Sequence, residues 1–276
     1  MSRTIGFEYR GDRRGGRTPF EIFLQYTDEK EKSAAVLGRI LSRLIRRNGM
    51  AFLDIGSGNG TYLRSTLEKV KSPKKTTITL LEPSDDLVEK LRDTAKFFPR
   101  NTVAKVVHSS FEDFTTDAQF EIVLASHVPL AKDDPASLPA IYSRMLGLLK
   151  PNGSLIVVLR GKDDIHWFRT TFKSCIMGID YKSLTIGDAE QVFKKISSQL
   201  PLRLKKFSTQ ANALLPYPDN MEDVIAIVEF LLNIKWEEIP TAIRDSVLGY
   251  IRDKHGRLRQ IDSFLVVKRV CHQEGY

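Results

Sequence analysis

The chain has 276 residues, with 42 Lys and Arg against 34 Asp and Glu, which gives a formal net charge of +8. Its apolar fraction of 42% and charged fraction of 28% are typical of a globular protein with one enlarged domain or a domain plus a small subdomain. The sequence has no apolar run as long as a membrane span and no signal-peptide core near residue 1, so we expect neither feature.

The two cysteines, Cys175 and Cys271, are far apart and lack metal-type spacing. We therefore expect no disulfide framework, no metal site and a cytoplasmic location. The positive charge permits contact with RNA, but solvated helix faces and termini account for the basic clusters equally simply. These clusters lie at 10–17, 43–47, 203–206 and 252–259.

The first predicted helix begins at Thr18, which forms a capping-box pattern with Glu21 and precedes a proline at the first helical position. A second amphipathic helix is expected over 29–47. The basic, glycine-rich residues before Thr18 are expected to be mobile without ligand.

Three aromatic residues of the first helix, Phe20, Phe23 and Tyr26, share one face at helical spacing. Such a stripe either covers a ligand as a lid or packs in the core. On the lid interpretation, Tyr26 is the strongest candidate for a substrate contact because its hydroxyl can reach polar groups.

The next element is a short apolar strand, 51–55, which contains Asp54 and is followed by Gly56, Gly58 and Gly60 at alternate positions, with Ser57 between the first two. Glycine permits positive φ and exposes backbone N–H groups, so a ligand can approach this loop closely. The helix that begins near Gly60 adds the positive end of its dipole. The pattern predicts a nucleotide-like ligand, which Asp54 either contacts directly or serves by organising the loop.

Strands and helices then alternate, which predicts a parallel sheet with helices on both faces. We expect strands at 76–81, 103–108, 122–125 and 154–159, and helices at 61–70, 84–97 and 135–149. Ligand sites in such sheets lie at the carboxyl ends of the strands.

Four candidate residues follow the predicted strands. Glu82, before Pro83, has two oxygens that suit a ribose diol. Ser110 and Phe111 follow the third strand, and Phe111 suits the core as well as a ligand contact. Ser126 follows the fourth strand.

His127 comes directly after Ser126. Because histidine titrates near neutrality, His127 either orients or deprotonates an amine, or packs as a structural side chain. Ser126, His127 and Tyr26 are therefore the candidate catalytic residues.

The D-x-G-x-G-x-G pattern at 54–60 resembles motif I of the Rossmann-like S-adenosylmethionine (SAM) methyltransferases. The acid at Glu82, the segment Ser109–Phe111, the strand and loop FEIVLASHVPL and the turn LLKPNGSLIVVL follow in the order of that family. The resemblance covers roughly residues 50–160. It implies an α/β fold with a mostly parallel seven-stranded sheet, an antiparallel C-terminal hairpin and a helical lid or insertion. It also implies SAM as cofactor, held by the glycine loop, Glu82, Pro83, Ser110, Phe111 and Ser126. In that family the segment of Ser110 and Phe111 contacts the adenine, and the methyl group to be transferred lies near the end of the fourth strand.

The chain beyond residue 160 exceeds what that minimal fold requires. We expect helices at 163–173, 188–199, 220–232 and 240–252, a strand within 202–215, and two closing strands at 256–260 and 263–270. His166 and Trp167 either wall a substrate pocket or pack a helix on the sheet. The expected organisation is a helical lid (1–48), a SAM-binding core (49–160), a substrate-recognition insertion (161–255) and a closing hairpin (256–276).

Several patchier segments resemble histamine N-methyltransferase and its relatives: FEIFLQYTDEKEK, Glu82–Ser84, KDDPASL, DDIHWFRTTF and GRLRQIDSFLVV. This resemblance implies N-methylation of a small amine by a monomer or weak dimer. The alternatives are an RNA or protein methyltransferase, or a SAM-binding regulatory protein without turnover.

Overall fold

A computed structural model describes residues 13–45, 50–70, 75–128 and 135–270. Its strands form one sheet in the order β3-β2-β1-β4-β5-β7-β6. The strands are β1 (Met50–Ile55), β2 (Thr76–Glu82), β3 (Thr102–His108), β4 (Phe120–Ser126), β5 (Leu149–Arg160), β6 (Leu202–Leu214) and β7 (Arg257–Arg269).

The helices follow the strands as the alternating pattern predicts. They are α1 (Pro19–Gln25), α2 (Glu29–Leu44), α3 (Thr61–Glu68), α4 (Asp85–Ala95), α5 (Leu138–Gly147), α6 (Asp164–Met177), α7 (Ile186–Ile196), α8 (Met221–Leu232) and α9 (Thr241–Asp253). A 3-10 turn at Pro135–Ser137 leads into α5, and another at Trp236–Glu238 precedes α9. None of these described helices is long and apolar enough to cross a membrane.

Strands β1 to β5 are mutually parallel, and β7 runs antiparallel between β5 and β6. The predicted Rossmann-like sheet with antiparallel C-terminal strands is therefore confirmed. Its register brings Asp54, Glu82 and Ser126 to the carboxyl ends of three neighbouring strands. The same register sets Asp262 of β7 opposite Arg160 at the end of β5.

The final strand corrects one prediction. Residues 256–260 and 263–270 were expected to form two strands of a hairpin, but 257–269 is a single strand paired along its length with β6. The polar residues Gln260 and Asp262 interrupt the apolar pattern and mimic a turn. Both are fully buried in the sheet, so the strand continues through them.

Two layers of helices cover the sheet. On one face of the sheet, α5 and α7 cover a core that buries large side chains such as Tyr142 and Phe193. The rings of these two residues stack with their centroids 4.6 Å apart. The opposite core is built by α2, α3 and α4 around Phe52 and Phe264. Because the central strands are buried on both faces, their sequences are continuous apolar runs rather than alternating ones.

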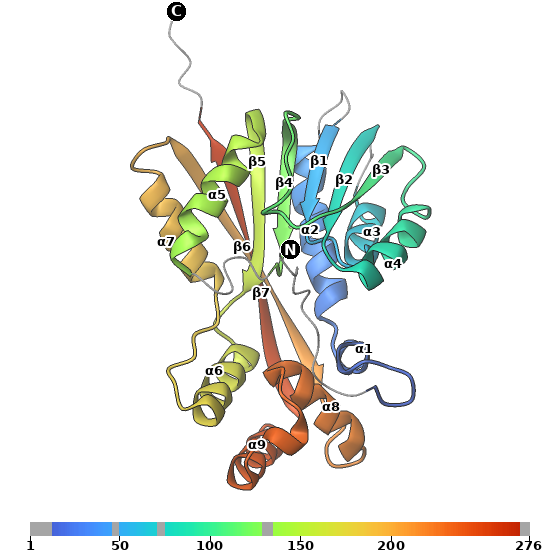
Figure 1. Cartoon of the computed structure of the whole chain (residues 1–276), viewed down its shortest axis with the longest axis vertical. Helices are drawn as coiled ribbons and strands as arrows, with labels where there is room; N and C mark the ends of the chain where they lie inside the picture. Colours follow the sequence, from blue (N-terminus) through green and yellow to red (C-terminus); the bar gives the residue numbers. More distant parts are fainter. Residues whose placement is uncertain (1–12, 46–49, 71–74, 129–134, 271–276) are drawn as a thin grey trace, which may run out of the picture.

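A separate helical cap stands beyond the carboxyl ends of the parallel strands, at the bottom of Figure 1. We use this name for α1, α6, α8, α9 and the adjoining ends of β6 and β7. Its own apolar core includes Phe23, Phe168, Ile227 and Ile251. The cap is built mainly from the residues predicted as lid and insertion, and it lies beside the edge where ligand sites are expected.

Part of the predicted mobile N-terminus is fixed to the cap. Gly15 and Gly16, both with positive φ, allow a tight turn in which Arg14 and Arg17 exchange backbone hydrogen bonds. The Arg14 guanidinium reaches the Glu229 carboxylate at 3.1 Å, and that of Arg17 reaches Asp223 at 3.5 Å. Residues 1–12 of the predicted tail lie outside the described part of the chain.

Candidate functional site

The glycine loop after β1 has the conformation that the sequence predicts. Gly56, Gly58 and Gly60 have φ values of 68°, 58° and 78°. An added β-carbon would lie 2.9 Å from Val128 at Gly56 and 2.7 Å from Leu91 at Gly60. Within the described residues, one at Gly58 would meet no atom within 4 Å. Gly58 therefore faces open space, as a loop that receives a ligand requires.

Glu82 holds this loop against the end of β2. Its carboxylate accepts hydrogen bonds from the backbone N–H of Gly58 at 2.7 Å and of Ser84 at 3.0 Å, one on each oxygen. Each oxygen can accept a second hydrogen bond, so both remain suited to a ribose diol. Ser57 completes the loop, because its N–H donates to Leu81 and its hydroxyl donates to the Asp54 carbonyl at 3.1 Å.

Two buried carboxyl groups lie beside the loop. Burial raises the pKa of Asp54 to about 7, and the nearby charge of Glu82 adds to the effect. Burial also raises the pKa of Glu82, against the opposing hydrogen bonds from Ser84 and Gly58. Desolvated carboxyl groups of this kind favour a ligand with positive charge, because such a ligand offsets the cost of their ionisation.

The candidate adenine contacts are engaged within the protein. The Ser110 hydroxyl donates to Asp113 at 2.8 Å and accepts from the Asp113 N–H at 3.1 Å, which closes a turn. Phe111 is 4% exposed, and the Arg144 guanidinium lies 4.5 Å from its ring centre. Phe111 is therefore a core residue, which is one of its two predicted roles. The Pro83 carbonyl lies 3.0 Å from His108 Nε2, which ties the end of β2 to β3.

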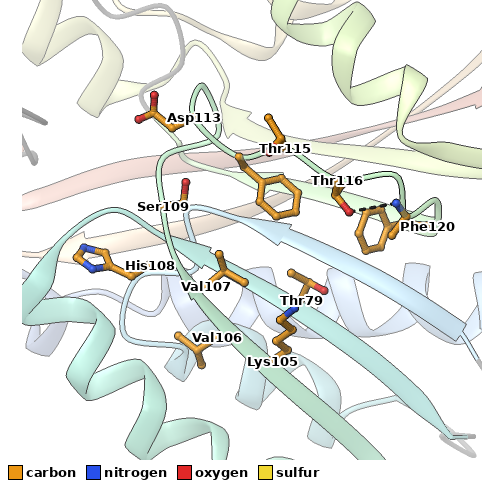
Figure 2. A pocket seen from close by; sticks show the side chains of 12 residues that line it. Thr79, Lys105, Val106, Val107, His108, Ser109, Asp113, Thr115, Thr116 and Phe120 are labelled. Carbon is orange, nitrogen blue, oxygen red and sulfur yellow. Dashed lines mark hydrogen bonds between the residues drawn. The ribbon is translucent and has the colours of Figure 1, made fainter. Parts of the chain in front are cut away.

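A groove of about 630 Å³ lies beside this region, on the face of β2 and β3 (Figure 2). The segment 109–119 forms no helix between β3 and β4, so this face of the sheet stays uncovered. Thr79, Lys105 and Val107 lie on one side of it in Figure 2 and Phe120 on the other. Phe114 also lines the groove. It touches Ser109 but contains neither the glycine loop nor Glu82, so we do not identify it with the predicted cofactor site.

The end of β4 carries a strained histidine. His127 has a φ of 53°, in the left-handed region that non-glycine residues rarely adopt, and its N–H donates to the Val158 carbonyl at 2.9 Å. Backbone strain of this kind persists where surrounding structure enforces it and is frequent at functional sites. Ser126, just before it, lies near the buried hydroxyl of Tyr62, which contacts the Ser33 hydroxyl at 2.8 Å.

The His127 ring points into a buried polar cluster, which we call the acceptor cluster: Glu29, His127 and Asp262. Its Nε2 lies 3.2 Å from Asp262 Oδ1 and 3.7 Å from Glu29 Oε1. Asp262 is fully buried and Glu29 is 2% exposed. His127 Nε2, Glu29 Oε1 and both Asp262 oxygens have no hydrogen-bond partner among the described residues. Burying unpaired polar atoms is costly, so this arrangement indicates a place for a donor.

Basic residues surround the acceptor cluster without filling it. The Arg160 guanidinium lies 3.3 Å from Glu29 Oε2, and the Lys30 ammonium lies 3.4 Å from Glu29 Oε1. Burial opposes the charge of Asp262, but the charges of His127 and Arg160 hold its pKa well below the usual range. The three ligand atoms lie within 4.8 Å of one another, a spacing that suits a metal ion. Because both Glu29 oxygens already face cations, the charge that remains on the cluster is too small to favour a divalent metal ion, whereas an N–H donor of at most one positive charge fits.

Sequence reasoning missed Glu29, Asp262 and Arg160 as site residues. Asp262 could have been found as the single acid inside the apolar run QIDSFLVV, but the sequence predicts a turn between two strands at this position. Glu29 begins a helix, where an acid has an ordinary role opposite the helix dipole. Only the tertiary fold brings the starts of α2 and α6, the end of β5 and the middle of β7 together.

The proposed lid aromatics pack in the helical cap. The Phe20 and Phe23 rings lie 5.2 Å and 4.9 Å from that of Phe230. The Tyr26 hydroxyl donates to Asp223 at 2.7 Å, and this bond raises the Tyr26 pKa. The structure therefore does not bring these three residues to His127, and their stripe forms core.

His166 and Trp167 both lie in α6. The backbone N–H of His166 donates to Asp163, the N-cap residue of α6, and burial lowers the pKa of its ring. Trp167 is 46% exposed, and its ring stacks on that of Tyr250 in α9 with centroids 4.6 Å apart. Trp167 therefore packs between helices, which is one of its two predicted roles. His166 lies at the junction between β5 and the cap.

Residues 52–153 match the sequence model of a family described as "Methyltransferase domain". A search of curated proteins gave no match. Among solved structures, the chain is similar to a protein of Bacillus halodurans provisionally assigned as a methyltransferase, with a TM-score of 0.53 and 14% identity over 85% of this chain and 99% of that one.

Two further structures show the same fold. A SAM-dependent methyltransferase of Methanosarcina mazei has a TM-score of 0.51 and 10% identity over 84% of this chain and 98% of that one. A mycolic acid cyclopropane synthase, solved with S-adenosylhomocysteine (SAH), has a TM-score of 0.52 and 13% identity over 85% and 83% of the two chains. At these identities the likeness concerns the fold alone.

Proposed function

We propose that the chain, which contains a class I SAM-dependent methyltransferase domain over residues 52–153, transfers the methyl group of SAM to a nitrogen atom of a small molecule. The predicted enzyme class and cofactor are confirmed by the matched domain and its fold. The observation that supports nitrogen is the acceptor cluster, whose buried acceptor atoms lack hydrogen-bond donors among the described residues. Amine N–H groups supply such donors.

The cofactor roles follow from the geometry of the loop. Gly56, Ser57, Gly58 and Gly60 would lie along the methionine part of SAM, and Glu82 would bind the ribose hydroxyls. Asp54 would offset the positive charge of the cofactor, because its carboxyl group is buried beside the loop. The segment around Ser110 and Phe111 would border the adenine through backbone groups and apolar contact, since the Ser110 hydroxyl is engaged with Asp113.

Once the acceptor nitrogen is neutral, the reaction depends mainly on alignment. The sulfonium of SAM already activates the methyl group, so the protein must hold a nitrogen lone pair in line with the S–CH3 bond and exclude water. Ser126 and His127 lie at the end of β4. His127 belongs to the acceptor cluster, and β4 lies between the strand of the glycine loop and the strands β5 and β7. Ser126 and His127 are our candidates for orienting the nitrogen.

A small acceptor suits the position of the helical cap, which stands over the carboxyl edge of the sheet with an apolar core of its own (Figure 1). We assign substrate recognition to this cap and therefore to most of the insertion at 161–255. Nucleic acid is not favoured, because the acceptor cluster consists of buried carboxylates, which repel phosphate. The low cysteine content favours a cytoplasmic enzyme.

The test is transfer of a labelled methyl group from SAM into a metabolite extract, a total RNA preparation and a protein extract, with mass and NMR identification of the products. We expect label in small molecules that carry a new N–CH3 group. Label mainly in RNA or protein, or on oxygen or carbon, would contradict the proposal. SAM binding without any transfer would identify a regulatory protein instead.

A further inference from the structure

We propose that the acceptor is a protonated aliphatic amine, and that His127 removes its proton while Asp262 positions the ring and stabilises the imidazolium. This inference rests on the proposed function. The acceptor cluster offers buried carboxylate oxygens to an ammonium group, and it places an imidazole nitrogen 3.2 Å from one of them. A neutral amide or aromatic nitrogen needs no such arrangement.

Three observations on His127 support the role of base. Its left-handed backbone is held by a hydrogen bond to Val158, which aims the ring toward β7. Its Nε2 is buried, lies 3.2 Å from Asp262 Oδ1 and meets no well-directed hydrogen-bond partner among the described residues, so no such partner competes with a substrate N–H group for this nitrogen. The side chain as a whole is 23% exposed, which gives the proton a route to solvent.

Asp262 fits a positioning role because its carboxylate lies against the His127 ring. It is a fully buried acid within a strand, and neither oxygen has a hydrogen-bond partner among the described residues, although Arg160 is a nearby cation. A buried carboxylate without a hydrogen bond is costly, and the cost falls further when a second cation forms beside it. Protonation of His127 would create that cation at 3.2 Å.

The proton passes from the substrate ammonium to His127 and then to solvent, so the step needs no further group. The N–H bond of the ammonium breaks and an Nε2–H bond forms on His127. The amine lone pair then attacks the methyl carbon of SAM, and the electrons of the C–S bond return to sulfur, which gives neutral SAH sulfur and a methylammonium product. The proton leaves His127 to solvent.

Of the other charged groups around the His127 ring, Lys30 also favours loss of the substrate proton, and Arg160 pairs with Glu29. The Lys30 ammonium repels that of the substrate and so favours the neutral amine. Glu29 completes the carboxylate wall at 3.7 Å from Nε2, and the Arg160 guanidinium, 3.3 Å from its other oxygen, holds it in place. Asp163 pairs with Arg160 at 3.6 Å, and the buried hydroxyl of Tyr62 lies among these charges with its pKa raised by burial.

The experiment compares two probe amines at saturating SAM: benzylamine, which is protonated at neutral pH, and aniline, which is not. The variants are His127→Gln and Asp262→Asn, both of similar shape to the native residues. The control is His255→Gln, because His255 is an exposed histidine that also has a left-handed φ, of 50°, but lies outside the site. The readout is kcat/KM from pH 5.5 to 10.

For benzylamine, we expect His127→Gln to lower kcat/KM by about 100-fold or more, the usual contribution of general base catalysis. Asp262→Asn should lower it by about tenfold and shift the acidic limb of the profile to lower pH. Aniline rates should change less than threefold in both variants, and the control should match the wild type.

Equal losses for benzylamine and aniline, with SAM affinity and thermal stability retained, would reduce both residues to structural roles and overturn the inference. A wild-type preference for aniline would overturn it as well. If the extract experiment yields no N-methyl product at all, the proposed function itself fails. If N-methyl products form but the two variants show no amine-dependent difference, only the proton-transfer inference fails.

Discussion

The pH dependence of stability depends on Asp54, which is 4% exposed at the end of β1. Burial raises its pKa from 3.8 to about 7. A shift of about 3 units corresponds to roughly 4 kcal/mol, which the ligand-free protein loses when this carboxyl ionises. Because the folded-state pKa is the higher one, the associated stability is complete below about pH 4 and is lost as the pH rises through 7.

Asp54→Asn removes this ionisation while keeping the shape of the side chain. Between pH 5 and pH 8, the free energy of unfolding of the ligand-free wild type should fall by about 2.5 kcal/mol more than that of the variant. The assay is urea denaturation of both proteins at the two pH values, with SAM absent. SAM should then stabilise the wild type more at pH 8 than at pH 6, because its positive charge favours ionised Asp54.

The variant should show no such increase, and its SAM dissociation constant should rise at least tenfold, as expected for loss of a charged contact of about 1.5 kcal/mol or more. Two results would refute the reasoning. One is an identical pH dependence of stability in both proteins. The other is unchanged SAM affinity in the variant, which would make Asp54 an organiser of the loop alone.

Glu82→Gln should weaken SAM binding at least tenfold by calorimetry, because an amide cannot accept all the hydrogen bonds of the carboxylate; equal affinity would move the ribose site elsewhere. Gly58→Val should abolish binding while circular dichroism stays native, since a β-branched residue resists a φ of 58° and projects into open space; normal binding would make the loop a simple turn. Arg14→Ala should destabilise the cap by about 3 kcal/mol in urea, because it leaves Glu229 buried without its cation, and a change below 0.5 kcal/mol would show that the contact is dispensable. Turnover should be the same with and without EDTA, because Lys30 and Arg160 occupy the Glu29 oxygens; loss of activity that zinc or magnesium restores would instead make the acceptor cluster a metal site.

The cofactor half of the molecule follows a short-range pattern, which is why the sequence predicted it well. Alternate glycines, an acid at a strand end and alternation of strands with helices are local signals, and each has a single physical explanation. The structure places Gly58 and Glu82 2.7 Å apart through one hydrogen bond. Their sequence separation is bridged by a single strand–helix–strand unit.

The acceptor cluster, in contrast, depends on contacts between segments that are distant in the sequence. Glu29, His127 and Asp262 come from α2, the end of β4 and β7, and no spacing rule links them. The sequence left a lid and a core role open for the aromatic stripe of α1 for the same reason, because periodicity shows that Phe23 faces something apolar but does not show what that is. Here the partner is Phe230 of α8, more than 200 residues away.

The most direct measurement is a crystal structure of the protein with SAH and the methylated amine product. We expect the ribose hydroxyls on Glu82, the thioether sulfur facing the end of β4, and the product nitrogen within hydrogen-bond distance of Asp262 and His127. A product nitrogen bound away from the acceptor cluster, for example in the groove over β2 and β3, would show that the acceptor cluster does not bind the substrate.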